Sequence, residues 1–274
     1  MSAPTPELKT PVARAIGPHE IEIWLTYYGE IVDDQHLDRL RRLLDAEEVA
    51  QERRFYFADD RKRYLVTRAM VRTVLSRYVP IAPEQWVFSK NAYGRPAIAD
   101  QIALAQDLAR DLSFNISHTR GLIVLAVSRG RELGVDVEKV AARQVSLDVA
   151  NAYFSPNEIA DLSCVAPDWQ QHRFFEYWTL KESYIKARGM GLSLPLDGFS
   201  FEFPNRASVR ISIRPDLLDH AERWSFWQYR PTADYLMAVC AERQGDTPAA
   251  ISMQRFCPLT GETPITVQPL RRSD

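Results

Sequence analysis

The sequence repeats one order of elements, in which a long helix is followed by short strands, the last of them wholly apolar. Residues 59–78 carry apolar side chains at helical spacing, and residues 122–127 form the apolar strand that closes this first half. In the second half we expect the long helix over residues 169–187 and the closing strand over residues 235–240. The repeat predicts an α+β fold of two similar halves related by pseudo-twofold symmetry, with the active site in the cleft between them.

The ends of the chain differ in composition from its middle. Residues 1–18 are rich in proline, alanine and threonine, and residues 258–274 contain Pro258, Pro264 and Pro269. We therefore expect a flexible tail at each end. The N-terminal half is placed at residues 19–130 and the C-terminal half at residues 131–257.

Composition and charge exclude several classes of function. A formal net charge of −2 over 274 residues gives no basis for binding nucleic acid or an acidic membrane surface. No segment approaches the roughly 20 apolar residues of a membrane span, and the N-terminus lacks the apolar core of a signal peptide. The three cysteines have no pairing pattern, which favours a reducing compartment. We expect a cytoplasmic protein.

The segment GVDVEK at residues 134–139 is expected to form a strand with two carboxylates on one side. Residues two apart in a strand point the same way, so Asp136 and Glu138 share a face while Val135 and Val137 face the core. Two such carboxylates lie about 7 Å apart and suit Mg²⁺, which completes its shell with water and phosphate oxygens. Taken alone, the pair is more typical of a polar edge strand.

The segment WTLKES at residues 178–183 lies in the second long helix and adds a third acid. Glu182 and Lys186 are four residues apart and share a helix face with Trp178. A surface Glu–Lys pair is the common explanation of this spacing. Here the helix is apolar on most sides, which argues against idle solvent-exposed groups. Three acids and a lysine suit a divalent metal that holds a pyrophosphate.

Other candidate ligands of a phosphate are basic or lie in turns. His118 follows Ser117 at the end of a strand, where a hydrogen-bonded turn residue and a protonated anion ligand are both open. Arg95 stands between Gly94 and Pro96 on a rigid turn and could hold a phosphate or stack on a base. The basic stretch of residues 53–77 indicates either a solvated helix face or a surface for an acidic partner.

With these motifs in hand, the chain resembles the 4'-phosphopantetheinyl transferases, in particular the long type that activates surfactin synthetase. The resemblance extends from about residue 44 to residue 240. It rests on the motifs RRFY at 53–56, YGRP at 93–96, FNISH at 114–118, GVDVEK at 134–139, WTLKES at 178–183 and GLSLPL at 191–196.

The resemblance implies a monomeric enzyme that moves the 4'-phosphopantetheine arm of coenzyme A. The acceptor would be a serine hydroxyl of an acyl, peptidyl or polyketide carrier protein, and adenosine 3',5'-bisphosphate would be released. By carry-over, Asp136, Glu138 and Glu182 would hold Mg²⁺ on the pyrophosphate. Glu182, directly or through a bound water, would take the serine proton, and Lys186 would neutralise charge on the transferring phosphate.

The resemblance also assigns the contacts to coenzyme A. Ser117 and His118 would bind its phosphates, and Arg95 its adenine or ribose-phosphate end. Two basic positions that the family often uses for the 3'-phosphate are occupied here by Glu48 and Gln51, and a family threonine is replaced by Tyr64. Arg54 or Arg63 is then the expected replacement.

Two alternatives to a transferase remain at this stage. A metal-dependent hydrolase could use the same acids to cleave coenzyme A with water. A non-catalytic module could bind coenzyme A without reacting with it, although a pure binder has no need of three convergent carboxylates.

Overall fold

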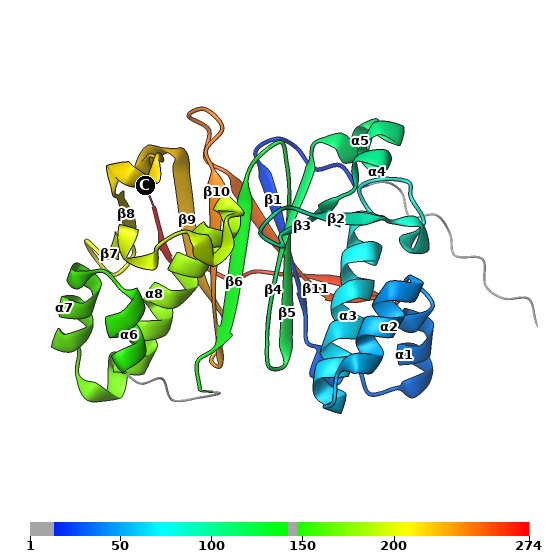
Figure 1. Cartoon of the computed structure of the whole chain (residues 1–274), viewed down its shortest axis with the longest axis horizontal. Coiled ribbons are helices and arrows are strands. Elements are labelled where there is room, and N and C mark those ends of the chain that lie inside the picture. The colour runs from blue at the N-terminus through cyan, green and yellow to red at the C-terminus, as the bar shows by residue number, and fades with distance from the viewer. Residues whose placement is uncertain (1–13, 142–146, 274) are drawn as a thin grey trace, which may run out of the picture.

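The computed structural model describes residues 14–141 and 147–273, which form two halves of similar build (Figure 1). The first half begins with strand β1 (Glu20–Thr26) and ends with a β-hairpin. Its helices are α1 (Asp34–Arg41), α2 (Ala46–Arg54), α3 (Ala58–Leu75), α4 (Asp100–Ala105) and α5 (Asp107–Arg110). Its other strands are β2 (Phe88–Lys90), β3 (Pro96–Ile98), β4 (Leu112–Thr119) and β5 (Leu122–Arg129).

The second half repeats this order from strand β6 (Leu133–Lys139) onward. Its helices are α6 (Leu147–Tyr153), α7 (Pro156–Cys164) and α8 (Pro167–Arg188). Its strands are β7 (Phe199–Glu202), β8 (Arg210–Ile213), β9 (Trp224–Thr232) and β10 (Tyr235–Glu242). Three further strands follow, β11 (Ala250–Cys257), β12 (Gly261–Ile265) and β13 (Pro269–Arg272).

The two halves share one strand arrangement. In the first, β5 lies between β1 and β4 and is antiparallel to both. In the second, β10 lies between β6 and β9 and is again antiparallel to both. Each half also carries a separate two-stranded sheet, β2–β3 or β7–β8, before its closing hairpin. The predicted α+β fold of two similar halves is therefore confirmed.

The halves pack with their sheets inside and their long helices outside (Figure 1). Alternate residues of β1 face opposite sides, as a strand requires. Trp24 packs under α3, whereas Ile23 joins the core between the two sheets. Val135 and Val137 enter that shared core from β6. α8 covers the outer face of the second sheet, where Leu180 and Tyr184 are fully buried.

Local sequence signals explain where the site-bearing helices begin and end. Asp33 accepts a hydrogen bond from the backbone of Gln35 as the cap of α1. Ser155 and Glu158 form the predicted capping box at the start of α7. α8 ends at Gly189, whose φ of 64° lies in the left-handed region that glycine adopts without strain.

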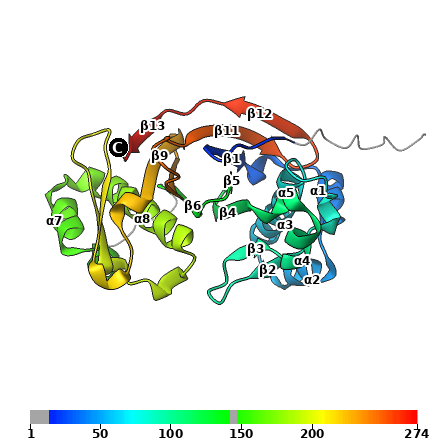
Figure 2. The same cartoon turned by 90° about the horizontal axis from the view of Figure 1, so that it is seen from above.

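The C-terminal strands differ from the sequence-based expectation. β11 lies within residues 131–257, assigned to the second half, but pairs in parallel with β1 in the first sheet. Residues 258–274, expected to be a flexible tail, contain β12, which extends the first sheet, and β13, which pairs with β9 in the second. Seen from above, these strands arch over both sheets (Figure 2). Of the expected N-terminal tail, residues 1–13 lie outside the described residues.

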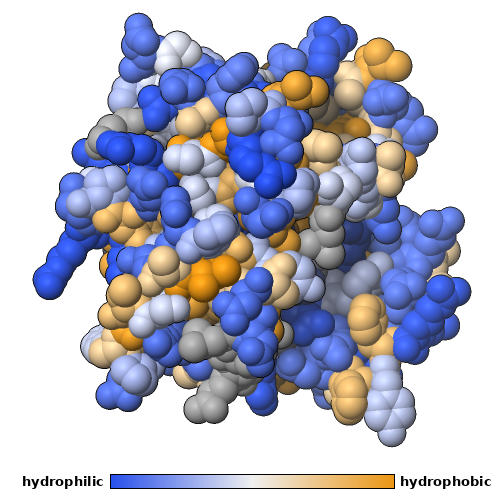
Figure 3. Space-filling model, turned by 60° about the vertical axis from the view of Figure 1, so that its left-hand side comes forward, coloured by the Kyte–Doolittle hydropathy of each residue, from blue (hydrophilic) through white to orange (hydrophobic). Residues whose placement is uncertain are grey.

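The surface is mixed in character. On the face shown in Figure 3, hydrophilic residues predominate and apolar ones form small patches among them. Within the described residues, none of the helices is both long enough and apolar enough to cross a membrane.

Removal of residues 258–274 is expected to lower the free energy of unfolding by about 2–4 kcal/mol, because each lost hydrogen bond contributes about 1 kcal/mol net. The segment contacts both halves. Arg271 forms an ion pair with Glu176 of α8 at 2.9 Å, and Glu262 forms one with Arg77 of the first half at 2.7 Å. Chemical denaturation of the truncated and full chains measures the difference. Equal unfolding midpoints and slopes would show that the segment does not tie the halves together.

Candidate active site

Side chains of β4, at the centre of the molecule, bond to the backbone of β6. These two strands belong to different sheets, so the outer edge of β6 has backbone N–H groups without a strand partner. Polar side chains on alternate residues of β4 accept hydrogen bonds from them. The three bonds run from Val135 to Asn115 Oδ1 (2.9 Å), from Val137 to Ser117 Oγ (3.2 Å) and from Lys139 to Thr119 Oγ1 (3.2 Å). We call this set the β4–β6 side-chain ladder.

α8 packs closely on the face of β6 that carries the acids. A Cβ atom at Gly134 would lie 2.0 Å from the carbonyl oxygen of Ser183 and 2.4 Å from the backbone nitrogen of Ala187. Only glycine therefore permits this approach. Gly134 and Asp136 face α8, whereas Val135 lies in the core between the sheets. The predicted shared face of the strand is confirmed for these residues.

Three elements meet at Asp136. Lys186 of α8 places its Nζ atom 2.6 Å from Asp136 Oδ1 and 2.9 Å from Ser117 Oγ. Ser117 of β4 donates its hydroxyl to the same Asp136 oxygen at 2.9 Å. The second oxygen of Asp136, Oδ2, is buried and has no hydrogen-bond partner. The structure thus brings together three of the predicted site residues from both halves.

Glu182 and Glu138 lie beside this cluster. Glu182 is half-buried on α8, one turn before Lys186. Burial raises the pKa of Glu182, the negative charge of Asp136 raises that pKa further, and Lys186 opposes the shift. Glu138 lines the adjoining pocket. Within the described residues, no group of three or more histidine, cysteine, aspartate or glutamate side chains is already arranged as a metal site.

A pocket of about 430 Å³ opens next to Asp136. Its walls include His118 from β4 and Arg63 from α3, together with Ser117 and Lys186. His118 is exposed, and partial desolvation by the neighbouring residues together with the positive charge of Arg63 lowers the pKa of its ring. The predicted role of His118 as a ligand of a phosphate stays a prediction.

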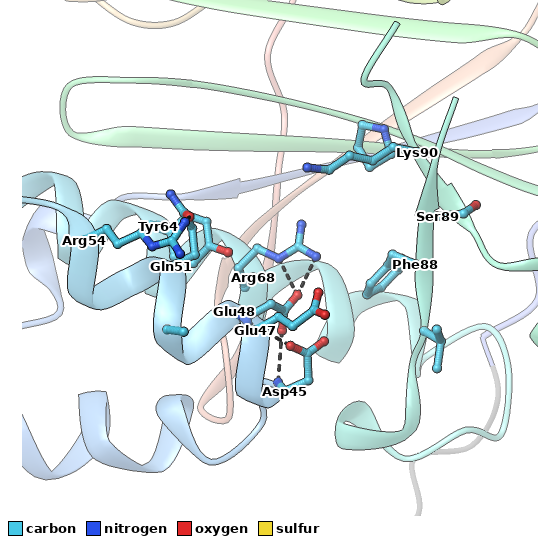
Figure 4. Close-up of a pocket in the computed structure, with 13 residues that line it drawn as sticks. Asp45, Glu47, Glu48, Gln51, Arg54, Tyr64, Arg68, Phe88, Ser89 and Lys90 are labelled. Atoms are coloured by element: carbon cyan, nitrogen blue, oxygen red, sulfur yellow. Dashed lines mark hydrogen bonds and ion pairs between the residues drawn. The ribbon is translucent and has the colours of Figure 1, made fainter. Parts of the chain in front are cut away.

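A second pocket, of about 980 Å³, adjoins the first and shares Tyr64 and Arg68 with it (Figure 4). It is bounded by α2, α3 and β2, and Arg54 lies on its wall. Arg68 is held by Glu48, which also pairs with the fully buried Arg72 at 2.7 Å. Part of the basic stretch is therefore paired internally and does not form a solvated face.

Arg95 lies away from this cluster. Its guanidinium bonds to Glu132 and to the carbonyl groups of Ala187 and Leu133. Arg95 does not line either of the two pockets described above. The predicted contact of Arg95 with a nucleotide therefore stays a prediction.

Lys181 of the WTLKES motif has a role that the sequence did not reveal. Its side chain is fully buried and its Nζ atom lies 2.8 Å from Glu158 Oε2, which is also fully buried. The same nitrogen donates to the carbonyl oxygens of Leu196 and Phe199 at 2.7 and 2.8 Å. Burial lowers the pKa of Lys181, and Glu158 opposes that shift. Lys181 thus anchors α8 to α7 and to the segment that enters β7.

The ladder residues Asn115 and Thr119 were not singled out in the sequence either. Their only signal is a polar residue at every second position, alternating with the apolar Phe114 and Ile116. That pattern is typical of a solvent-facing strand side, so a backbone partner for these side chains could not be predicted from it.

The chain is similar in sequence to known 4'-phosphopantetheinyl transferases. A family model described as the 4'-phosphopantetheinyl transferase superfamily matches residues 132–240, and one described as 4'-phosphopantetheinyl transferase, N-terminal, matches residues 33–130. The 4'-phosphopantetheinyl transferase ffp of Bacillus subtilis is 35% identical over 233 residues, covering 85% of this chain and 97% of that protein. Sfp of B. subtilis strain 168 is 34% identical over 236 residues, covering 86% and 98%.

Two more distant similarities were found. HetI of Nostoc, named a 4'-phosphopantetheinyl transferase, is 28% identical over 232 residues, covering 84% of this chain and 90% of that protein. Among solved structures, the holo-[acyl-carrier-protein] synthase of Thermotoga maritima aligns with a TM-score of 0.34 and 15% identity, over 50% of this chain and 84% of that one.

Replacement of Lys181 by alanine is expected to lower the free energy of unfolding by about 3–5 kcal/mol, because Glu158 is left as an uncompensated buried charge. Lys139→Ala is the matched control. Lys139 is partly exposed and lies 3.7 Å from Asp234, so its removal should change stability by less than about 1 kcal/mol. Urea unfolding followed by circular dichroism measures both. A Lys181→Ala variant as stable as the control would show that the buried pair does not anchor α8.

Proposed function

The chain belongs to the 4'-phosphopantetheinyl transferase superfamily, and on that premise we propose that it transfers the phosphopantetheine arm of coenzyme A to a carrier-protein serine with Mg²⁺. The bond formed joins the serine oxygen to the β-phosphorus of coenzyme A. The bond broken joins that phosphorus to the bridging oxygen, so adenosine 3',5'-bisphosphate leaves. The observation that carries the proposal is the meeting of Asp136, Lys186 and Ser117, which come from both halves.

The donor set at this point fits Mg²⁺. Asp136 Oδ2 is a buried carboxylate oxygen without a hydrogen-bond partner, and such an atom is costly unless a ligand completes it. Three carboxylates would hold the ion, those of Asp136, Glu138 and Glu182. Their side chains would rotate so that the three carboxylates converge on it. Bound Mg²⁺ would supply positive charge to the pyrophosphate.

Lys186 is the proposed cation for the transferring phosphate. Its ammonium group lies at the junction of β4, β6 and α8, where it now neutralises Asp136. A phosphoryl group in the adjoining pocket would receive hydrogen bonds from Lys186, His118 and Arg63. Lys186 is already held at this position by its bonds to Asp136 and Ser117, so this cation needs little reorganisation during the transfer.

Glu182 is the proposed base for the serine proton. Burial and the charge of Asp136 raise its pKa, which makes Glu182 a stronger base than an exposed glutamate. Its position on α8, one turn before Lys186, places the base and the cation on the same helix face. The proton can pass directly to Glu182 or through one water molecule.

The larger pocket is the proposed place for the nucleotide end of coenzyme A. It shares a wall with the pocket at Asp136, and its volume suits a large ligand. Arg54 on its wall would bind the 3'-phosphate. It would replace the two basic residues that the family often has at the positions of Glu48 and Gln51. The close pairing of Glu48 with Arg68 and Arg72 supports this assignment, because Glu48 is neutralised within the protein.

We further propose that the enzyme acts as a monomer in the cytoplasm. The two similar halves of one chain both supply residues to the proposed site, which supports a monomer. Cys164, Cys240 and Cys257 are all free thiols, which supports a reducing compartment.

Incubation of the protein with coenzyme A, Mg²⁺ and a panel of apo carrier proteins is expected to add one phosphopantetheine arm to the carrier serine, as measured by intact-protein mass spectrometry.

Replacing Asp136 by asparagine should lower kcat/KM about 100-fold or more while the fold is kept, because a charge that organises the site is lost. Release of adenosine bisphosphate at the same rate without a carrier would indicate a hydrolase. Unmodified carriers across acyl, peptidyl and polyketide types would contradict the proposal.

A further inference from the structure

A loop of the first half reaches the end of α8 in the second half. Residues 91–95 join β2 to β3, and Asn91 fixes their shape. Its side-chain Oδ1 accepts hydrogen bonds from the backbone N–H groups of Tyr93 (2.9 Å) and Arg95 (3.0 Å). Its backbone N–H also donates to the carbonyl of Arg95 at 3.0 Å. The loop is thus ordered by its own first residue.

The same loop bonds to the C-terminal carbonyl groups of α8. Asn91 Nδ2 donates to the Gly189 carbonyl at 2.8 Å, and Arg95 Nη1 donates to the Ala187 carbonyl at 2.9 Å. The last carbonyls of a helix have no partner within the helix, and a cation is favoured at that end. Arg95 supplies both a hydrogen-bond donor and a positive charge.

Arg95 also holds the start of β6. Its Nη1 atom lies 2.7 Å from Glu132 Oε2, and Nη2 donates to the Leu133 carbonyl at 3.2 Å. One guanidinium therefore contacts both elements of the second half that carry the site, β6 with Asp136 and α8 with Lys186. The contact is close, because a Cβ atom at Gly189 would lie 3.1 Å from Arg95. Arginine is suited to this position, since its donors are fixed in one plane.

We propose that Asn91 and Arg95 form a latch between the halves that positions the last turn of α8, so that Lys186 stays at Asp136. Arg95 is then a positioning residue and not a ligand of the nucleotide. The carbonyl that Arg95 holds belongs to Ala187, the residue directly after Lys186, so release of the latch would let the turn that carries Lys186 fray. The kinetic part of this inference rests on the proposed transferase function.

Three variants separate the latch from a nucleotide contact. Arg95→Ala is expected to lower kcat about 10-fold or more, because small displacements of a positioned group are costly, while the KM for coenzyme A changes less than about 3-fold. Glu132→Gln, which removes the negative charge that pairs with Arg95 and keeps an oxygen acceptor, should lower kcat in the same direction. Asn91→Ala, which removes no charge, should do so as well. Arg110→Ala is the matched control, because Arg110 pairs only within α5, with Asp107.

Hydrogen exchange gives a readout that does not depend on activity. The amide of Gly189 donates to Ile185 and Lys186, and Arg95→Ala should speed its exchange about 10-fold or more as the turn opens. This measurement needs no substrate, so it tests the latch even if the wild-type protein modifies no carrier. Thermal unfolding confirms that each variant is folded, and Glu132→Gln replaces Arg95→Ala if the latter is not.

Two results would overturn the latch. A rise of about 10-fold or more in the KM for coenzyme A in Arg95→Ala, with exchange of the Gly189 amide unchanged, would make Arg95 a nucleotide ligand. Unchanged kcat and exchange in Arg95→Ala, Glu132→Gln and Asn91→Ala would show that the loop does not position α8.

Discussion

The β4–β6 side-chain ladder is the contact on which the rest of the structure depends. A sheet edge offers backbone N–H groups that cost free energy when they are buried without partners. Another strand normally satisfies them, but β4 does so with Asn115, Ser117 and Thr119, spaced at the period of a strand. A side chain reaches farther than a backbone group, so these bonds keep β4 and β6 farther apart than two paired strands. The two sheets are therefore joined without forming one continuous sheet. The halves keep separate sheets and still have a fixed register.

The register decides which groups meet at the site. Ser117 Oγ accepts the ladder hydrogen bond from Val137 and donates one to Asp136. One atom therefore belongs both to the strand contact and to the site. α8 packs on β6 at Gly134, and this contact brings Lys186 to the carboxylate of Asp136. The first half contributes Arg63 and His118 to the adjoining pocket, and the second contributes Asp136, Glu138 and Lys186. A change in either contact would separate the proposed phosphate-binding side chains from the acidic ones.

The sequence predicted those parts of the fold and site that depend on local patterns. The alternation around Asp136 and the four-residue spacing of Glu182 and Lys186 placed each side chain on the correct face, because both patterns follow from backbone geometry. The C-terminal strands were missed because Pro264 and Pro269 indicate loops. In the structure these prolines lie in edge strands, where a missing donor costs little. Arg95 was assigned to a ligand because it stands on a turn between Gly94 and Pro96, and its bonds to Glu132 and Ala187 could not be predicted because these partners are distant in sequence.

Amide hydrogen exchange on β6 tests the ladder most directly. The account predicts that the amide of Val135 is protected in the wild-type protein, and that Asn115→Ala removes this protection while the amide of Lys139, bonded to Thr119, keeps its own. Rapid exchange of Val135 in the wild-type protein, or unchanged protection in Asn115→Ala, would contradict it.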